Sequence, residues 1–152
     1  MLLLETAPPD VGSAPRARVL GVDRSEAFVA TARAASYDSA NCQQLPRELA
    51  QRFLQPSVGD RAHIVPELQA LVTFQQHDLT RGVPGGRYAL IICKNVLLHL
   101  GEVVQEDLVE SLRGSLTDDG VLLVARSEIP LLLSLGAKSH EIAPGVIAFL
   151  AH

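Results

Sequence analysis

The chain has 152 residues, enough for one domain with a buried core. Its 13 basic and 17 acidic side chains give a net charge of -4, so it presents no basic field to nucleic acid, and with no Trp it has few surfaces on which bases could stack. Cys42 and Cys93 form no metal or redox motif and are predicted to be reduced thiols. No segment is long and apolar enough to span a membrane, and we therefore expect a cytoplasmic protein without membrane insertion.

The first half of the chain predicts a strand, a helix, an interruption and a second strand. The apolar run at 18–23 is typical of a buried strand, and apolar residues at helical spacing predict a helix over 24–35 with Ser25 as its cap. The segment 37–71 breaks this rhythm with three X-Pro pairs and is predicted to be an inserted subdomain. Alternation over 72–78 then predicts another strand that ends in polar residues.

The second half predicts two further strands around a helix, and a final strand at the sheet edge. The stretch Tyr88–Leu100 holds an unalternated apolar run that stops at Lys94-Asn95, which is typical of a strand covered on both faces. A helical stripe follows over 102–116, then a strand over 121–125 and an edge strand over 145–151. This order of strands and helices predicts a three-layer α/β domain with a mainly parallel sheet.

Polar side chains follow three of these strands, namely Asp23, Asp78 and Asn95. The carboxyl ends of parallel strands lie along one edge of a sheet, so the three side chains can converge on one ligand. A carboxylate there can accept two hydrogen bonds from a ribose diol, and a second one can meet an adenine amino group, which together suit a nucleoside cofactor. The alternatives are local: Asp23 caps the following helix, Asp78 forms an Asx-turn, and Asn95 supplies turn and capping hydrogen bonds.

Five blocks carry a resemblance to a known family: VLGVDRS, LPRELAQRFL, PELQALVTFQQHDL, GGRYALIICKNVLLHL and GVLLVARSE. In this order they are similar to CheR-type chemotaxis methyltransferases, over residues 18–128. The resemblance implies a Rossmann-like fold that binds S-adenosylmethionine and transfers its methyl group to glutamate side chains of chemoreceptors. It also implies a chemoreceptor or another signalling protein as the partner, while the oligomeric state stays open.

The resemblance also implies roles for individual residues. Asp23 would hold the cofactor ribose, Asp78 with Leu79 would lie against the adenine, and Lys94-Asn95 would line the cofactor and substrate cleft. The segment 37–71 would be the family's small β-subdomain, which docks the receptor tail in some members. The implied cofactor-binding residues are, in chain order, Asp23, Arg24, Asp78, Leu79, Lys94 and Asn95.

The sequence departs from the family pattern in three places. Lys94 stands where the family usually presents Arg, and His99 stands where it commonly has Tyr, so no catalytic residue is assigned. The family's first strand and its Gly-rich turn have no counterpart before Arg18, and Met1–Glu5 resembles the tail of the helix that follows that turn. We therefore expect a partial methyltransferase domain whose sheet lacks its first strand, with a gap or an exposed edge beside 18–23.

Three functions remain open from the sequence. The chain could be an enzyme or the larger part of one, an adaptor in chemotaxis-type signalling that has lost its catalytic activity, or a gene remnant without a function of its own. The missing Gly-rich turn favours the second and third of these, and the register of the five blocks favours the first.

Overall fold

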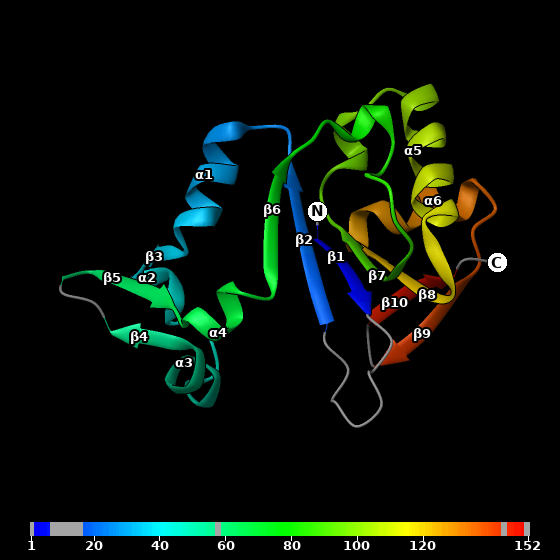
Figure 1. Ribbon diagram of the computed structural model, residues 1–152. Helices are drawn as coiled ribbons and strands as arrows, with labels where there is room; N and C mark the ends of the chain where they lie inside the picture. Colours follow the sequence, from blue (N-terminus) through cyan, green and yellow to red (C-terminus); the bar gives the residue numbers. More distant parts are fainter. Residues whose placement is uncertain (1, 7–16, 57–58, 144–145, 151–152) are drawn as a thin grey trace, which may run out of the picture.

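The computed structural model describes residues 2–6, 17–56, 59–143 and 146–150, which form a mixed α/β fold with one large and one small sheet (Figure 1). The large sheet has seven strands in the order β6-β2-β1-β7-β8-β10-β9. Their bounds are β1 (Leu2–Thr6), β2 (Ala17–Asp23), β6 (Val72–Gln76), β7 (Tyr88–Cys93), β8 (Leu116–Val124), β9 (Ser139–Ala143) and β10 (Val146–Leu150).

The sheet contains both parallel and antiparallel pairs of neighbouring strands. β2 is parallel to β6, and β7 is parallel to β8, whereas β1 is antiparallel to both of its neighbours and β10 is antiparallel to β8 and β9. The expectation of a mainly parallel sheet is therefore wrong, and the sheet is mixed. The last strand was also expected at the edge, but β9 pairs with its free side and takes that position.

Strand β1 corrects the expectation about the start of the chain. Leu3 lies opposite Leu20 of β2 on one side and Ile91 of β7 on the other, so β1 occupies the place where a gap was expected. The prediction that this segment resembles a helix tail is wrong. A run of three leucines suits an inner strand, and the backbone groups of β2 and β7 that face this place find partners in β1.

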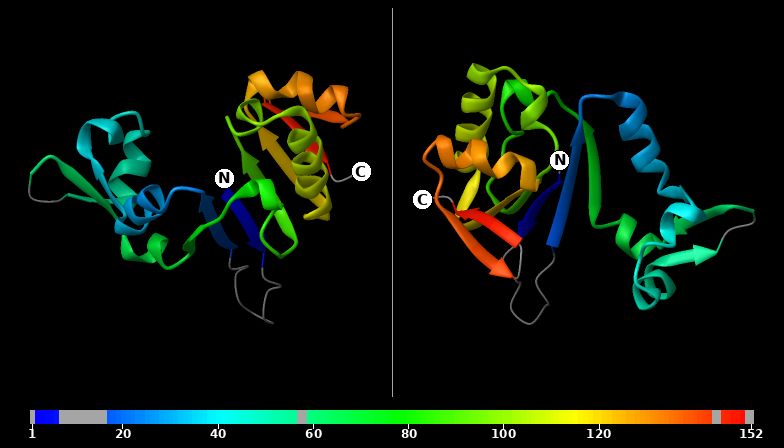
Figure 2. Two further views of the ribbon diagram at one scale, coloured as in Figure 1. Left: turned by 90° about the horizontal axis from the view of Figure 1, so that it is seen from above. Right: turned by 180° about the vertical axis from the view of Figure 1, so that it is seen from behind.

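Three helices accompany the large sheet. They are α1 (Glu26–Ala34), α5 (Glu102–Gly114) and α6 (Ile129–Ser134). The Ser25 side chain caps α1 by accepting from the Phe28 N–H, as predicted. Leu108, Val109 and Leu112 form the buried stripe of α5. Figure 2 shows α5 and α6 on opposite faces of the β7, β8 and β10 half of the sheet.

The largest core lies in this half of the molecule. It joins residues of β7, β8 and β10 to α5 and α6, and its fully buried members include Tyr88, Ile91, Cys93, Leu97, Leu112, Leu122, Leu132 and Phe149. The predicted apolar runs therefore supply the core, and they leave the polar residues that follow them at the rim of the sheet.

Strand β8 begins earlier than expected because it contains a wide bulge. Tyr88 of β7 pairs with Leu116 of β8, and Leu90 pairs with Val121. The chain therefore advances by two residues in β7 but by five in β8 between these two pairs. Gly120 lies in the bulge, where a Cβ atom would come within 2.8 Å of the carbonyl oxygens of Thr117 and Tyr88. Asp118, Asp119 and Gly120 thus form an irregularity within the strand.

Residues 36–69 form a separate small sheet beyond α1 and β6 (Figure 1). Its strands have the order β3-β5-β4 and are antiparallel. The Arg61 guanidinium links β5 to β3 by donating to the Ser36 hydroxyl at 2.8 Å and to the Ser36 carbonyl at 2.6 Å. The elements are β3 (Ser36–Asp38), α2 (Ser39–Cys42), α3 (Arg47–Phe53), β4 (Leu54–Pro56), β5 (Arg61–Ile64) and α4 (Pro66–Gln69).

Candidate functional site

The carboxyl ends of β2, β6 and β7 lie at one edge of the large sheet. β2 and β6 are parallel, and β1 is antiparallel to both β2 and β7, so all three strands run in one direction. Asp23, Asp78 and Asn95 end or follow these strands, and the topology therefore places them along a common edge. In open α/β sheets this edge is the usual position of a ligand.

Asp23 ends β2 and shapes the turn into α1. Its Oδ1 accepts from the Ser25 N–H at 2.8 Å, and its backbone carbonyl accepts from the His77 N–H at 2.9 Å. Gln76 reinforces the link between the two strand ends by donating to the Arg24 carbonyl at 3.0 Å. Asp23 thus supports the start of the helix from two residues before the Ser25 cap. Among the described residues, no donor contacts its second carboxylate oxygen.

Asp78 forms the Asx-turn that was one of its two alternatives. Its Oδ1 accepts from the Thr80 N–H at 3.0 Å and from the Thr80 hydroxyl at 2.9 Å, which begins the short 3₁₀ turn η1 (Leu79–Arg81). These bonds, the backbone one first, hold the pKa of the Asp78 carboxyl below its ordinary value. The exposed side chain therefore stays ionised at neutral pH. Leu79 is half-buried and packs on the core.

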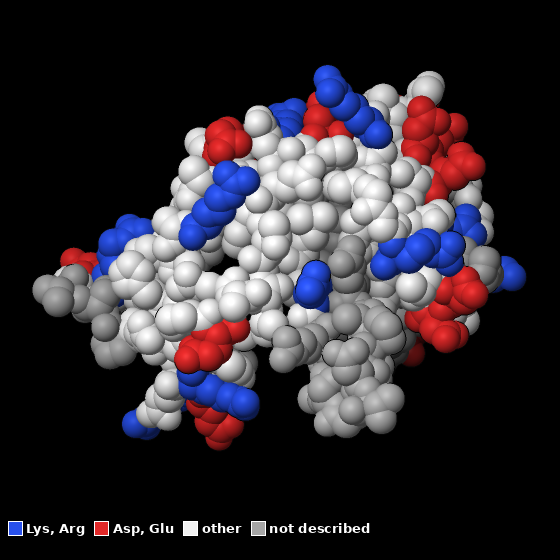
Figure 3. Space-filling view, viewed as in Figure 1, with Lys and Arg blue, Asp and Glu red and all other residues white. Residues whose placement is uncertain are grey.

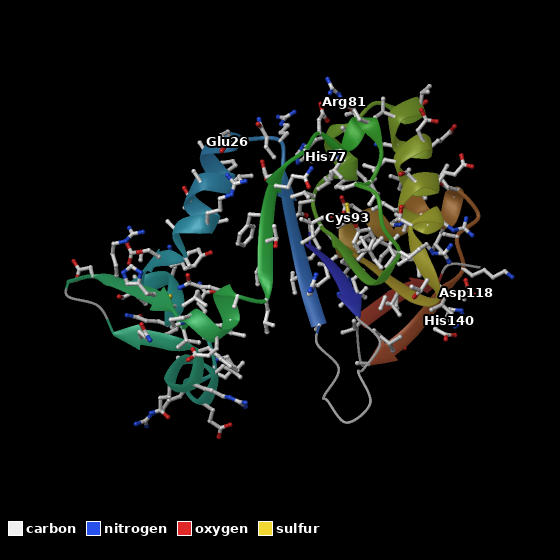
Figure 4. All side chains as sticks on the ribbon, viewed as in Figure 1. Glu26, His77, Arg81, Cys93, Asp118 and His140 are labelled. Atoms are coloured by element: carbon white, nitrogen blue, oxygen red, sulfur yellow. The ribbon has the colours of Figure 1, made fainter. Side chains whose placement is uncertain are left out.

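A polar hollow of about 700 Å³ opens at the ends of β2 and β6. Its lining consists of Arg24, Ser25, Gln76, His77, Asp78 and Arg81. In Figure 3, basic and acidic side chains lie next to one another above these strand ends, and Figure 4 shows His77 and Arg81 together on the segment after β6. The set combines guanidinium, hydroxyl, amide, imidazole and carboxylate groups, which suits a polar ligand that carries several hydroxyls.

A second, apolar hollow of about 230 Å³ is lined by residues of β2 and α1 and by Phe74 of β6. Phe28 and Phe74 are its largest lining side chains, and Asp23 contributes the carboxylate. Asp23 lines this apolar hollow, whereas the next residue, Arg24, lines the polar one. This arrangement suits a ligand with a hydroxylated part and a flat apolar part.

Lys94 and Asn95 lie apart from the hollow, although they share its edge. β1 lies between β2 and β7, and two strand spacings separate the ends of those strands by about 10 Å. Both side chains are exposed, and the Asn95 backbone is left-handed with φ of 57°. The structure thus brings Asp23, Arg24 and Asp78 together, and leaves Lys94-Asn95 as a second group along the edge.

Glu128 is a buried residue to which the sequence assigned no role. Its exposed fraction is 0%, and its carboxylate accepts four backbone N–H groups, three of them from Asn95, Val96 and Leu97. The fourth comes from Ala125, three residues earlier. That spacing is the one available signal in the sequence, because a Glu three residues after a turn start is typical of a capping box.

Cys93 contributes packing rather than chemistry. It is 0% exposed at the end of β7 (Figure 4). Burial, and secondly the nearby Glu128 carboxylate, raise the pKa of its thiol to about 12. The thiol is therefore neutral at physiological pH and is no candidate nucleophile.

Two further classes of site were sought in the described part of the chain. No group of three or more His, Cys, Asp or Glu side chains there is arranged to hold a metal ion. No helix in the same residues has the length and apolar character needed to cross a membrane.

A mixed α/β sheet with polar side chains at the carboxyl ends of its parallel strands is typical of domains that bind a small ligand at that edge. The family comparison is specific: residues 1–133 match the family described as CheR methyltransferase, SAM binding domain. This match covers most of the chain, and the protein therefore belongs to the CheR methyltransferase family.

Individual relatives are distant and longer than this chain. It is 25% identical over 133 residues to chemotaxis protein methyltransferase Cher2 of Pseudomonas putida, covering 86% of this chain and 48% of that protein. It is 26% identical over 149 residues to the chemotaxis protein methyltransferase of Vibrio parahaemolyticus, covering 97% and 54%. The chain thus spans about half the length of these relatives. A solved DhpI-SAM-HEP complex aligns over 55% of this chain and 44% of its own, with 18% identity and a TM-score of 0.35.

Proposed function

We propose that this chain binds S-adenosylmethionine at the edge formed by Asp23, Asp78 and Asn95. The single observation that carries the proposal is the family match over residues 1–133. The hollow at the ends of β2 and β6 supports it, because it offers hydrogen-bonding groups for a nucleoside, and the hollow lined by Asp23 and Phe28 offers an apolar surface. The same proposal takes the large sheet as a variant of the Rossmann-like methyltransferase fold, and residues 37–71 as its inserted subdomain.

Asp23 is the proposed ribose ligand. A ribose diol offers two O–H donors, and the second carboxylate oxygen of Asp23 has no donor among the described residues. Arg24 lies next to it in the lining of the polar hollow. Asp78 and Leu79, across the β2 and β6 pair, are the proposed neighbours of the adenine.

The proposed reaction is carboxyl methylation of glutamate side chains in a chemoreceptor. The cofactor supplies a methyl group on a positively charged sulfur, an activated electrophile. A glutamate oxygen forms a bond to the methyl carbon as the carbon–sulfur bond breaks and its electron pair passes to sulfur, so no proton is transferred. The domain therefore has to align the two groups and exclude water. The exposed Lys94 ammonium is placed to attract the glutamate carboxylate as a point charge.

The first experiment measures cofactor binding by the purified chain. Calorimetric titration with S-adenosylhomocysteine should give a saturable heat, and Asp23→Ala should weaken the affinity about tenfold or more, as expected for a lost hydrogen bond to a charged group. Asp118→Ala is the matched control, because Asp118 is an exposed carboxylate that pairs with Arg87 away from this edge. Absence of binding by a folded wild-type chain would refute cofactor binding.

A second candidate function is a binding module in chemotaxis-type signalling that does not use the cofactor. The direction of β1 favours it, because an antiparallel strand between β2 and β7 begins, rather than ends, at the ligand edge. β1 therefore ends at the opposite edge of the sheet, and its carboxyl end cannot form a turn at the ligand edge. The same titration decides between the two, since a folded chain that binds no S-adenosylhomocysteine fits the module and contradicts the enzyme.

A further inference from the structure

Glu128 is a charged side chain with 0% exposure, and the site described above makes no direct use of it. Burial of a carboxylate is costly unless its charge is compensated by hydrogen bonds or a cation. No Lys, Arg or His of the described residues forms a salt bridge with it. The compensation comes from backbone N–H groups alone, which makes the position of these groups depend on the carboxylate.

The four hydrogen bonds join the ends of two neighbouring strands. Oε1 accepts from Val96 and Leu97, both at 2.9 Å, and Oε2 accepts from Asn95 at 3.0 Å. Oε2 also accepts from Ala125, directly after β8, at 2.9 Å. Three successive N–H groups that converge on one anion form a nest, and here the anion belongs to the same chain. Glu128 therefore locks the turn after β7 to the turn after β8.

This contact fixes the residues that extend along the ligand edge. Without the carboxylate, the N–H groups of Asn95, Val96 and Leu97 would have no partner of their own, because no other acceptor contacts them among the described residues. Leu97 is fully buried in the core, so packing of this side chain also restrains the turn. Between these two restraints, the Lys94 and Asn95 side chains stay exposed at the edge.

We propose that Glu128 is a positioning residue of the ligand site, which holds the turn 94–97 in the conformation that presents Lys94 and Asn95 to the bound cofactor. Its role in binding rests on the proposed function, whereas its hold on the turn does not. The carboxylate does not contact the ligand itself in this proposal. It acts through the backbone of Asn95.

Glu128→Gln in the full chain is the sharpest test. The amide has the same shape, but its nitrogen cannot accept hydrogen bonds, so one pair of N–H groups loses its partner. Hydrogen exchange at the amides of residues 95–97 should accelerate about tenfold or more, and the affinity for S-adenosylhomocysteine should fall by about the same factor. Both are measured on the folded variant.

Phe149→Leu is the control for a merely structural effect. Phe149 is buried in the same core on β10, and its shortening should lower stability without removing a bond to the turn. The proposal is upheld when Glu128→Gln weakens binding and Phe149→Leu does not. It is overturned when Glu128→Gln binds and exchanges like the wild type, or when both variants lose affinity equally.

The two proposals fail in different ways. A wild-type chain that binds no S-adenosylhomocysteine refutes the proposed function, and the exchange of residues 95–97 still decides whether Glu128 holds the turn. If Glu128→Gln does not fold, Glu128→Asp is measured in the same way, since it keeps the charge but is one methylene shorter. Weaker binding with faster exchange at residues 95–97 then supports the proposal, and unchanged values for both overturn it.

Discussion

Asn95 has the backbone conformation that the candidate site depends on most. Its φ of 57° places it in the left-handed region, which Asn tolerates better than other residues with a side chain. This conformation follows β7 and directs the next N–H groups toward Glu128. Asn95 therefore makes the turn through its backbone, whereas no capping hydrogen bond from its side chain is found among the described residues. The same turn leaves its side chain exposed at the edge, and the two roles are compatible.

Two substitutions at Asn95 separate the conformation from the side chain. Asn95→Gly should change the free energy of unfolding little, because Gly adopts a positive φ without strain. Asn95→Val should destabilise the protein by about 1–3 kcal/mol, since a β-branched residue is strained there. Urea unfolding of the two variants and the wild type measures this difference. Equal stability of both variants would show that position 95 is not held at a positive φ.

At the scale of elements, the sequence predicted most strands and helices where apolar periodicity was long enough to decide. β2, α1, β6, β7 and α5 lie within a few residues of their predicted bounds. β1 was missed because the short apolar run Met1–Leu4 has no period that separates a strand from a helix. Its partners β2 and β7, far along the chain, decide its conformation.

Only part of the candidate site could be predicted, because contacts between residues far apart in the chain cannot be read from local sequence. Polar residues at strand ends can be recognised from sequence, and the structure places Asp23, Asp78 and Asn95 along one edge. For Glu128 the local sequence offered only its capping-box spacing from Ala125. Its hold on the turn after β7 could not be recognised, because it comes from contacts with residues about thirty positions earlier.

The central position of β1 can be tested with proline. Each inner residue of a central strand donates its N–H to one neighbour or the other, so Leu3→Pro should remove a ladder bond to β2 or β7. We expect a loss of at least about 2 kcal/mol in the free energy of unfolding, from the missing bond and the ring clash. Thermal and urea unfolding both report it.

Ile142→Pro is the matched control for this strand. Ile142 lies in the edge strand β9, at the irregularity where no residue of β10 is paired with it. Proline is tolerated in edge strands and at bulges, so it should cost far less there than at Leu3. Similar losses at the two positions would mean that β1 is not an inner strand of the folded sheet.

At the scale of the whole molecule, the two cysteines lie in different parts of the fold, one beside the small sheet and one in the large sheet. Cys42 is half-buried in α2 beside the small sheet, and Cys93 is fully buried at the end of β7 in the large one. The pKa of Cys93 is raised to about 12 from an ordinary value of 9.0, mainly by burial. The folded state thus binds this proton more tightly than the unfolded chain does, so its contribution to stability is complete below pH 9 and is lost as the pH rises from about 9 to 12.

Thiol labelling should separate the two residues in the native protein. At pH 8 an alkylating reagent should modify Cys42 readily, while Cys93 should react only as fast as the core around β7 opens, because its thiol is neutral and shielded. Peptide mass spectrometry after timed labelling measures both, and Cys42→Ser isolates the slow site. Urea should accelerate Cys93 labelling in step with global unfolding. Rapid labelling of Cys93 without denaturant would instead mean that the β7 and β8 core opens locally, and with it the turn that carries Lys94 and Asn95.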